Sequence, residues 1–130
     1  MVDAKTILLV EDNPDDEFLA LRALRRHGLR DVVVARDGEQ AVDQLFEAIT
    51  PLDPWLVLLD LKLPKMNGLE VLRTIRSVER TRHTPVIVIS SSQEESDVVQ
   101  CRELGVLAYL TKPIDGEKIM ALLATAGLSS

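Results

Sequence analysis

The feature that most constrains the fold of this chain is a regular alternation between short apolar runs and longer amphipathic segments. Five runs rich in aliphatic and β-branched residues recur along the sequence: Thr6–Val10, Val32–Ala35, Leu56–Asp60, Val86–Ser90 and Ala108–Leu110. Three of them are continuously apolar, which is typical of strands that are covered on both faces of a parallel sheet. Each run is followed by a segment with helical periodicity. Five such units predict an α/β fold, with a doubly wound parallel sheet and helices on both of its faces.

The segments between the runs carry the start and stop signals of helices. In the first, Asn13 can cap the helix, Pro14 suits the first helical position, and basic residues precede a stop at Gly28. A second helix is expected to begin near Gly38, and others over Leu69–Val78, over Glu94–Leu104 and after Asp115. The predicted buried stripes comprise Ala41, Val42, Leu45, Phe46 and Ile49 in the second helix, Leu69, Leu72 and Ile75 in the third, Val98, Cys101 and Leu104 in the fourth, and Ile119, Leu122 and Leu123 in the fifth.

Length and charge limit the classes of function that fit this chain. Its 130 residues predict a single domain over residues 1–130, with no room for an output domain. The net charge of −6 argues against DNA or an anionic membrane as the main partner, because a phosphate backbone needs a basic face. The single cysteine, Cys101, excludes an internal disulfide. Because we find neither a signal peptide nor a membrane-spanning run, we expect a cytoplasmic protein without a membrane partner.

Polar residues gather where the predicted strands end. Glu11 and Asp12 follow the first run, Asp60 and Ser90 end the third and fourth, and Lys112 follows the fifth. Because ligands of open α/β sheets bind at the carboxyl ends of the strands, these side chains should lie close together. Three neighbouring carboxylates raise one another's pKa unless a cation sits among them, and Mg²⁺ prefers such oxygen ligands. The serine and the lysine are then donors for a phosphate oxygen, so the sequence predicts a site for phosphoryl chemistry.

The motifs ILLVEDNP, LVLLDLKLPKMNGLEVL, PVIVISSS and AYLTKP stand in the order and spacing of the receiver domain of two-component response regulators. The chain resembles this family over essentially its whole length. The resemblance implies a flavodoxin-like sheet of strand order 2-1-3-4-5 with five helices. It also implies a stand-alone response regulator in phosphorelay signal transduction. Such a protein is a phosphoacceptor switch and not an enzyme, apart from Mg²⁺-dependent self-phosphorylation and self-dephosphorylation.

The resemblance assigns a role to each acidic residue of the site. Asp60 would accept a phosphoryl group from a phosphohistidine on a sensor histidine kinase. Asp12 and Asp60 would bind Mg²⁺ directly, and the backbone carbonyl of Lys62 would complete the protein ligands. Glu11, where Asp is commoner in the family, would act on the metal through a water molecule. The side chains of Lys62 and Ser92, two places after Asp60 and Ser90, would tune the rate of dephosphorylation.

The resemblance also assigns the switch. Lys112 would pair with the phosphoryl oxygens, and its bond to Pro113 is expected to be cis. The hydroxyl of Ser90 would move to bond the phosphoryl group, and Tyr109 would then pack inward. The surface that changes would be made by the fourth helix, the fifth strand and the fifth helix, either for binding a partner or for forming a homodimer.

In sequence, the motifs most resemble those of stand-alone receivers that are paired with bacterial phytochrome kinases. Such a kinase is therefore the expected partner. The short connection Ala48–Pro54 and a C-terminal tail without aromatic residues depart from that type. We expect the arginines of the first and third helices to lie on solvated faces: Arg22, Arg25, Arg26, Arg73 and Arg76. The alternative for the three in the first helix is a share in kinase docking.

Three rival functions fit the sequence less well. An aspartyl phosphohydrolase generally needs a second acid two residues after its nucleophile, where this chain has Lys62. A flavin binder on the same fold needs a phosphate loop after the first strand, where Glu11, Asp12, Asp15 and Asp16 would repel a phosphate. The third rival is a degenerate receiver that serves only as an interaction module, which the intact set of site residues disfavours.

Overall fold

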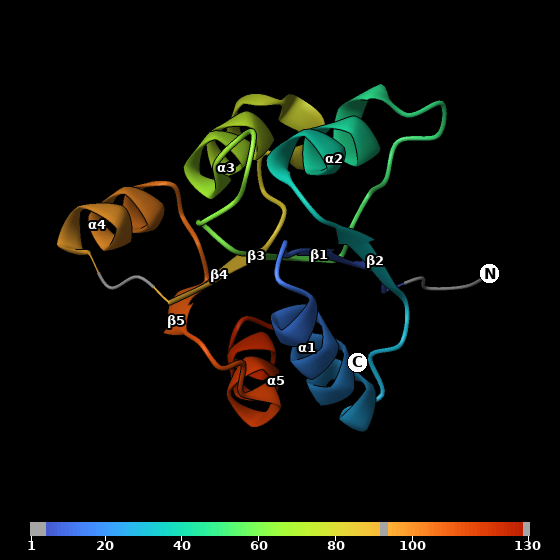
Figure 1. Cartoon of the computed structure of the whole chain (residues 1–130), viewed down its shortest axis with the longest axis vertical. Helices are drawn as coiled ribbons and strands as arrows, with labels where there is room; N and C mark the ends of the chain where they lie inside the picture. The colour runs from blue at the N-terminus through green and yellow to red at the C-terminus, as the bar shows by residue number, and fades with distance from the viewer. Residues whose placement is uncertain (1–4, 92–93, 129–130) are drawn as a thin grey trace.

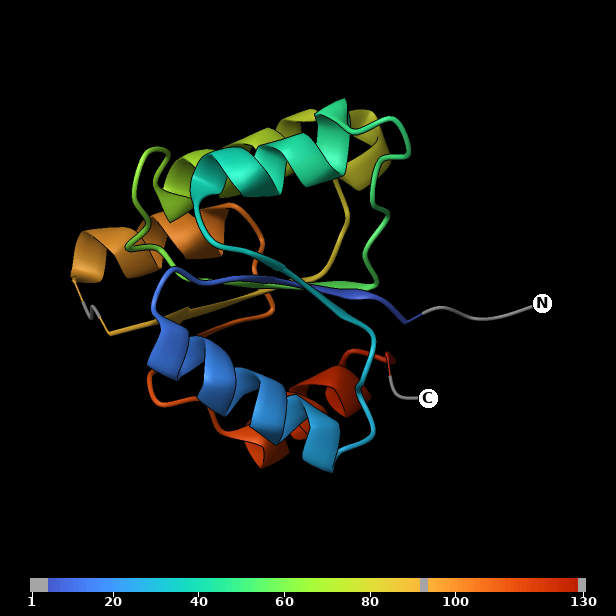
Figure 2. The same cartoon turned by 45° about the vertical axis from the view of Figure 1, so that its right-hand side comes forward.

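The computed structural model describes residues 5–91 and 94–128 and confirms the predicted fold. Five parallel strands form one sheet in the order β2-β1-β3-β4-β5. They are β1 (Ile7–Val10), β2 (Val32–Ala35), β3 (Leu56–Leu59), β4 (Val86–Ser90) and β5 (Ala108–Thr111). The sheet is the middle layer of three, as Figures 1 and 2 show from two directions. The predicted strands therefore lie within one residue of the observed ones at either end.

Helices cover both faces of the sheet. They are α1 (Pro14–Arg26), α2 (Gly38–Val42), α3 (Gly68–Ser77), α4 (Glu95–Glu103) and α5 (Gly116–Thr125). On one face lie α1 and α5, and on the other lie α2, α3 and α4 (Figure 1). Alternate residues of β1 serve the two layers, since Leu8 packs under α2 and α3 whereas Ile7 packs under α1 and α5. This two-sided burial explains why the strands are continuously apolar. No helix in the described part of the chain is long and apolar enough to cross a membrane.

The second helix differs from its prediction. Only Gly38–Val42 is α-helical, and a π-helical turn follows over Asp43–Glu47. Leu45 of the predicted stripe is buried, but Ile49 is fully exposed, so its assignment to the core was wrong. The reason is that the chain turns extended at Ala48, whose N–H still bonds the carbonyl of Asp43 at 2.8 Å. Ile49 thus lies beyond the helix, and helical periodicity no longer applies to it.

Arg76 in α3 also departs from its prediction, because its guanidinium lies half-buried at the end of the helix and not on a solvated face. It donates to the carbonyl oxygens of Leu104 at 2.6 Å and Thr84 at 2.7 Å. It also reaches the carbonyls of Arg82 and Gly105, both at 3.2 Å. Burial lowers the pKa of this arginine. One side chain therefore ties α3 both to the segment before β4 and to the turn between α4 and β5.

Gly68 begins α3 at a place where the helix approaches the end of β3. Its N–H donates to the carbonyl of Leu61 at 3.0 Å. A Cβ atom at this position would overlap the carbonyl oxygen of Asp60 and the Cα of Leu61, which are backbone atoms and cannot turn aside. Glycine is therefore needed here for close packing of the helix against the residue that ends β3.

We predict that Gly68→Ala lowers the free energy of unfolding by about 1–3 kcal/mol, although alanine favours helices. Gly116→Ala is the matched control, because Gly116 also begins a helix. Its Cβ would meet the ring of exposed His27 at 2.9 Å and the carbonyl of Ala23 at 3.1 Å, and the ring can move. Urea unfolding measures both variants. Equal losses in the two would contradict the close approach at Gly68.

Candidate functional site

The carboxyl ends of four strands bring the predicted residues together. Backbone hydrogen bonds extend the sheet past its last paired residues: Glu11 N donates to Ala35 O at 2.9 Å, Asp60 N to Val10 O at 3.1 Å and Lys112 N to Ser90 O at 3.0 Å. These bonds fix the backbone from which each functional side chain projects. Glu11 and Asp60 are each only 4% exposed, and Ser90 is fully buried.

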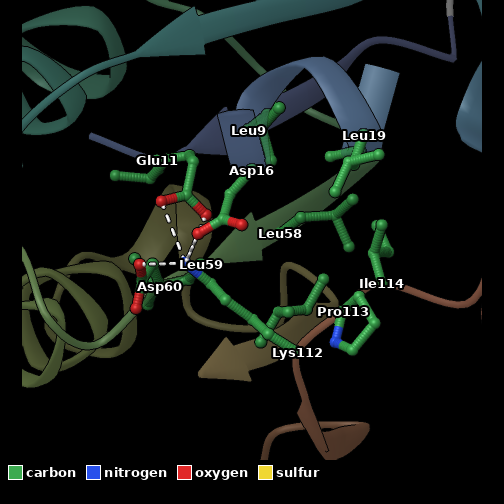
Figure 3. A pocket seen from close by; sticks show the side chains of 13 residues that line it. Leu9, Glu11, Asp16, Leu19, Leu58, Leu59, Asp60, Lys112, Pro113 and Ile114 are labelled. Atoms are coloured by element: carbon green, nitrogen blue, oxygen red, sulfur yellow. Dashed lines mark hydrogen bonds and ion pairs between the residues drawn. The ribbon is translucent and has the colours of Figure 1, made fainter. Parts of the chain in front are cut away.

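The ammonium group of Lys112 lies among three carboxylates (Figure 3). Its Nζ is 2.9 Å from an oxygen of Glu11, 2.7 Å from Oδ2 of Asp16 and 2.8 Å from Oδ2 of Asp60. The other oxygen of Asp60 accepts a hydrogen bond from the backbone N–H of Lys62 at 3.0 Å. Both oxygens of Asp60 therefore have donors, and its carboxylate is held in one orientation.

Asp16 is the site residue that sequence reasoning missed. The sequence placed it in the first turn of the first helix, where an acidic residue is usually explained by the helix dipole. In the structure Asn13 caps α1 by accepting hydrogen bonds from the N–H groups of Asp15 and Asp16 at 2.9 and 3.1 Å. The cap orients the first turn so that Asp16 faces Lys112 (Figure 3). Its place in the first turn of the helix that follows the end of the first strand was the available signal.

Glu11, Asp12 and Asp60 form a group that could hold a metal ion. One carboxylate oxygen from each lies within 4.8 Å of the others, and Asp12 is exposed whereas the other two are buried. Oxygen ligands at such spacing suit a hard divalent cation such as Mg²⁺. Among the described residues, the donor set therefore fits the metal that the sequence implied.

The pKa values of Glu11 and Lys112 are both raised, and the two shifts have opposite effects on stability at neutral pH. Burial raises the pKa of Glu11 to about 7. The hydrogen bond from Lys112 acts to lower this pKa, and the negative charge of Asp60 acts to raise it. Burial disfavours the charged form of Lys112, but its hydrogen bonds to Asp16, Asp60 and Glu11 outweigh burial and raise its pKa. The lysine is thus firmly cationic, whereas burial favours the protonated form of Glu11.

Two further predicted features lie in β5 or directly after it. The bond between Lys112 and Pro113 is cis, as expected. Tyr109 in β5 is partly buried and packs against the core under α2, α3 and α4. Ser92 lies outside the described residues. A small pocket opens beside Asp60 and Lys112, with an apolar wall that includes Leu19, Leu58, Ile89, Pro113 and Ile114.

Comparison with known proteins identifies the family. A family model described as the response regulator receiver domain matches residues 7–124. The chain is 40% identical over 120 residues to the probable methanogenesis regulatory protein FilR2 of Methanothrix harundinacea, covering 90% of this chain and 77% of that protein. It is 39% identical over 115 residues to the transcriptional regulatory protein CpxR of Escherichia coli, covering 88% of this chain but only 46% of CpxR.

Solved structures agree with this result. The bacteriophytochrome response regulator RtBRR is 50% identical with a TM-score of 0.82, covering 95% of this chain and 78% of that one. The bacteriophytochrome response regulator AtBRR is 43% identical with a TM-score of 0.85, covering 99% of this chain and 96% of that one. The Mn²⁺-bound form of response regulator Rcp1 is 34% identical with a TM-score of 0.81, covering 92% of both chains.

We predict that Glu11→Gln stabilises the metal-free protein at pH 8 and has little effect at pH 5. The folded-state pKa of Glu11, about 7, exceeds its ordinary value of 4.5, so the folded protein binds more protons between these values. The free energy of unfolding therefore falls as pH rises through this window. Glutamine does not ionise, so Glu11→Gln should raise the free energy of unfolding at pH 8 by about 1–3 kcal/mol.

Urea unfolding in the presence of a chelator at the two pH values measures this effect. Exposed Glu47→Gln, which removes one surface carboxylate, is the control. A stabilisation by Glu11→Gln that is equal at pH 5 and pH 8 would exclude the ionisation of Glu11 as its cause.

Proposed function

Since this chain belongs to the response regulator receiver domain family, we propose that it is a phosphoacceptor switch whose phosphorylated residue is Asp60. The observation that carries the proposal is the convergence of donors on this carboxylate. Lys112 and the N–H of Lys62 hold its two oxygens at 2.8 and 3.0 Å. Transfer of a phosphoryl group needs such positioning and the neutralisation of oxygen charge, and little else from the protein.

We assign a divalent cation, Mg²⁺, to the acidic group. Asp12 and Asp60 are its direct carboxylate ligands, the carbonyl of Lys62 is the third protein ligand, and Glu11 acts through water. The metal supplies positive charge for the phosphoryl oxygens when it is bound. The grouping of the three carboxylates supports this assignment, as does the Mn²⁺-bound structure of Rcp1.

The protein's own residues divide the remaining work. An oxygen of Asp60 forms the new bond to phosphorus as the bond from phosphorus to the histidine nitrogen of the donor breaks. Lys112 donates to a phosphoryl oxygen in place of its present bond to Asp60. The N–H of Lys62, 3.0 Å from Oδ1 of Asp60, lies close enough to share in binding the phosphoryl group. The buried hydroxyl of Ser90, at the end of the adjacent strand, turns toward the same oxygens.

Phosphorylation then alters the surface made by α4, β5 and α5. Movement of Ser90 leaves space that Tyr109 fills, and this aromatic ring already packs against the core beneath α4. The changed surface binds a partner or a second copy of the chain. A coupling free energy of about 1–3 kcal/mol would change such an affinity by roughly five- to hundredfold.

A sensor histidine kinase is the proposed donor, and a bacterial phytochrome kinase is the first one to test. The likeness to two bacteriophytochrome response regulators supports this choice. We propose no binding to DNA, because a net charge of −6 disfavours association with a phosphate backbone. We place this phosphotransfer in the cytoplasm.

We predict that incubation with acetyl phosphate and Mg²⁺ adds one phosphoryl group to the protein, and that Asp60→Asn abolishes the addition. The reason is that asparagine lacks the anionic oxygen that must bond phosphorus. Intact-protein mass spectrometry measures the added group. The matched control is Asp43→Asn at an exposed position on the π-helical turn.

Removal of Mg²⁺ by a chelator should also prevent the addition. No adduct on the wild-type protein, or an adduct that persists in Asp60→Asn, would refute the assignment of Asp60.

We predict that Ser90→Ala still accepts the phosphoryl group but loses the response at Tyr109. Tyr109 is the chain's single tyrosine, so fluorotyrosine labelling gives one ¹⁹F resonance. In the wild-type protein this resonance should shift on phosphorylation, and in Ser90→Ala the shift should fall by more than half. An equal shift in both proteins would contradict the role of the serine hydroxyl.

A further inference from the structure

Lys112 has all of its donors engaged before any phosphoryl group arrives. A protonated lysine has three N–H donors, and the structure gives it three carboxylate partners. Those partners are Glu11, Asp16 and Asp60, at 2.9, 2.7 and 2.8 Å. The side chain of Lys112 is only 15% exposed, so water offers few alternative partners. To bond a phosphoryl oxygen, the lysine must therefore release one of these carboxylates.

The three partners differ in what else they can bind. Glu11 and Asp60 belong to the group that could hold a cation, but Asp16 does not. Asp60 loses its negative carboxylate when it becomes an acyl phosphate, and Glu11 would serve the metal ion. Asp16 is therefore the partner that has no competing role and can stay with the lysine throughout.

We propose that Asp16 is the permanent counter-ion of Lys112 and acts as a positioning residue for the proposed phosphorylation of Asp60. Its carboxylate holds the ammonium beside Asp60, where the phosphoryl oxygens arrive. It also offsets a positive charge that would otherwise repel the metal ion. This inference depends on the proposed function for its effect on the rate, but not for its effect on metal binding.

The local structure explains how Asp16 can hold the lysine in place. It stands in the first turn of α1, where the side chain of Asn13 fixes its backbone N–H at 3.1 Å. Its side chain is 31% exposed, whereas those of Glu11 and Asp60 are 6% and 4% exposed. A carboxylate at the rim keeps part of its hydration, so its desolvation costs less free energy than that of the two buried carboxylates.

The test compares Asp16→Asn with Asp15→Asn. Asp15 lies in the same turn of α1, is exposed, and makes the same backbone contact with the cap Asn13. Both changes remove one negative charge near the start of the helix, so they alter the net charge and the helix dipole alike. Asp16→Glu retains the carboxylate on a longer side chain and tests for rescue by charge.

Two measurements are made on the 130-residue protein. Electron paramagnetic resonance of free Mn²⁺ gives the affinity of the unphosphorylated protein for the metal. In Asp16→Asn this affinity should fall roughly three- to tenfold, because Lys112 then pairs more strongly with Glu11 and Asp60 and competes with the ion. In Asp15→Asn it should change less than twofold. Asp16→Glu should recover at least half of the lost affinity on a logarithmic scale.

The second measurement is the initial rate of phosphorylation by acetyl phosphate at saturating Mg²⁺. Asp16→Asn should lower the maximal rate about tenfold without raising the KM for acetyl phosphate, since the donor loses no contact but the lysine is less well placed. Equal Mn²⁺ affinities of Asp16→Asn and Asp15→Asn would overturn the proposal. A maximal rate of Asp16→Asn equal to that of the wild-type protein would also overturn it. A wild-type protein that accepts no phosphoryl group would reject the proposed function, and the Mn²⁺ comparison would then decide the role of Asp16 alone.

Discussion

The ion cluster around Lys112 is the interaction on which the rest of the site depends. Two of its carboxylates, Glu11 and Asp60, are almost completely buried, and burying an unpaired carboxylate costs several kcal/mol. A single ammonium group within 3 Å of both offsets much of this cost. The lysine follows β5, so its long side chain has to pass the end of β4 to reach the end of β3. Ser90 is the last residue of β4.

The sheet order makes this arrangement possible. With β3 in the centre, β1 and β4 are its direct neighbours, and their carboxyl ends lie on either side of Asp60. Apolar layers on both faces then fix the strands, because nearly every residue of β1, β3 and β4 is buried. This packing supplies the stability that the charged edge lacks. Burial raises the pKa of Glu11 to about 7, so keeping this carboxylate charged at neutral pH costs part of the free energy of folding.

The strands, most helices and the main site residues could be predicted from the sequence because each depends on local pattern and on one topological rule. Apolar runs define the strands, and the rule that ligands bind at their carboxyl ends gathers Glu11, Asp60 and Lys112. Ile49 could not be placed in this way, since helical periodicity does not reveal where a helix stops. Asp16 and Arg76 were misread for a related reason. Each has an adequate local explanation on its own helix, whereas a partner lies far away in sequence: Leu104 for Arg76 and Lys112 for Asp16.

Arg76 bears on how a signal would travel from the site. The site end of α4 follows β4 and Ser90, whereas the other end leads into the turn whose carbonyls, at Leu104 and Gly105, are held by this arginine. The same guanidinium bonds the segment before β4, so the far ends of α4 and β4 are fastened to α3. If phosphorylation moves Ser90, the displacement is then largest at the end of α4 near Asp60 and smallest at the clamped end. For the proposed switch, a fixed far end favours a tilt of α4 against β5 over a uniform shift of the helix.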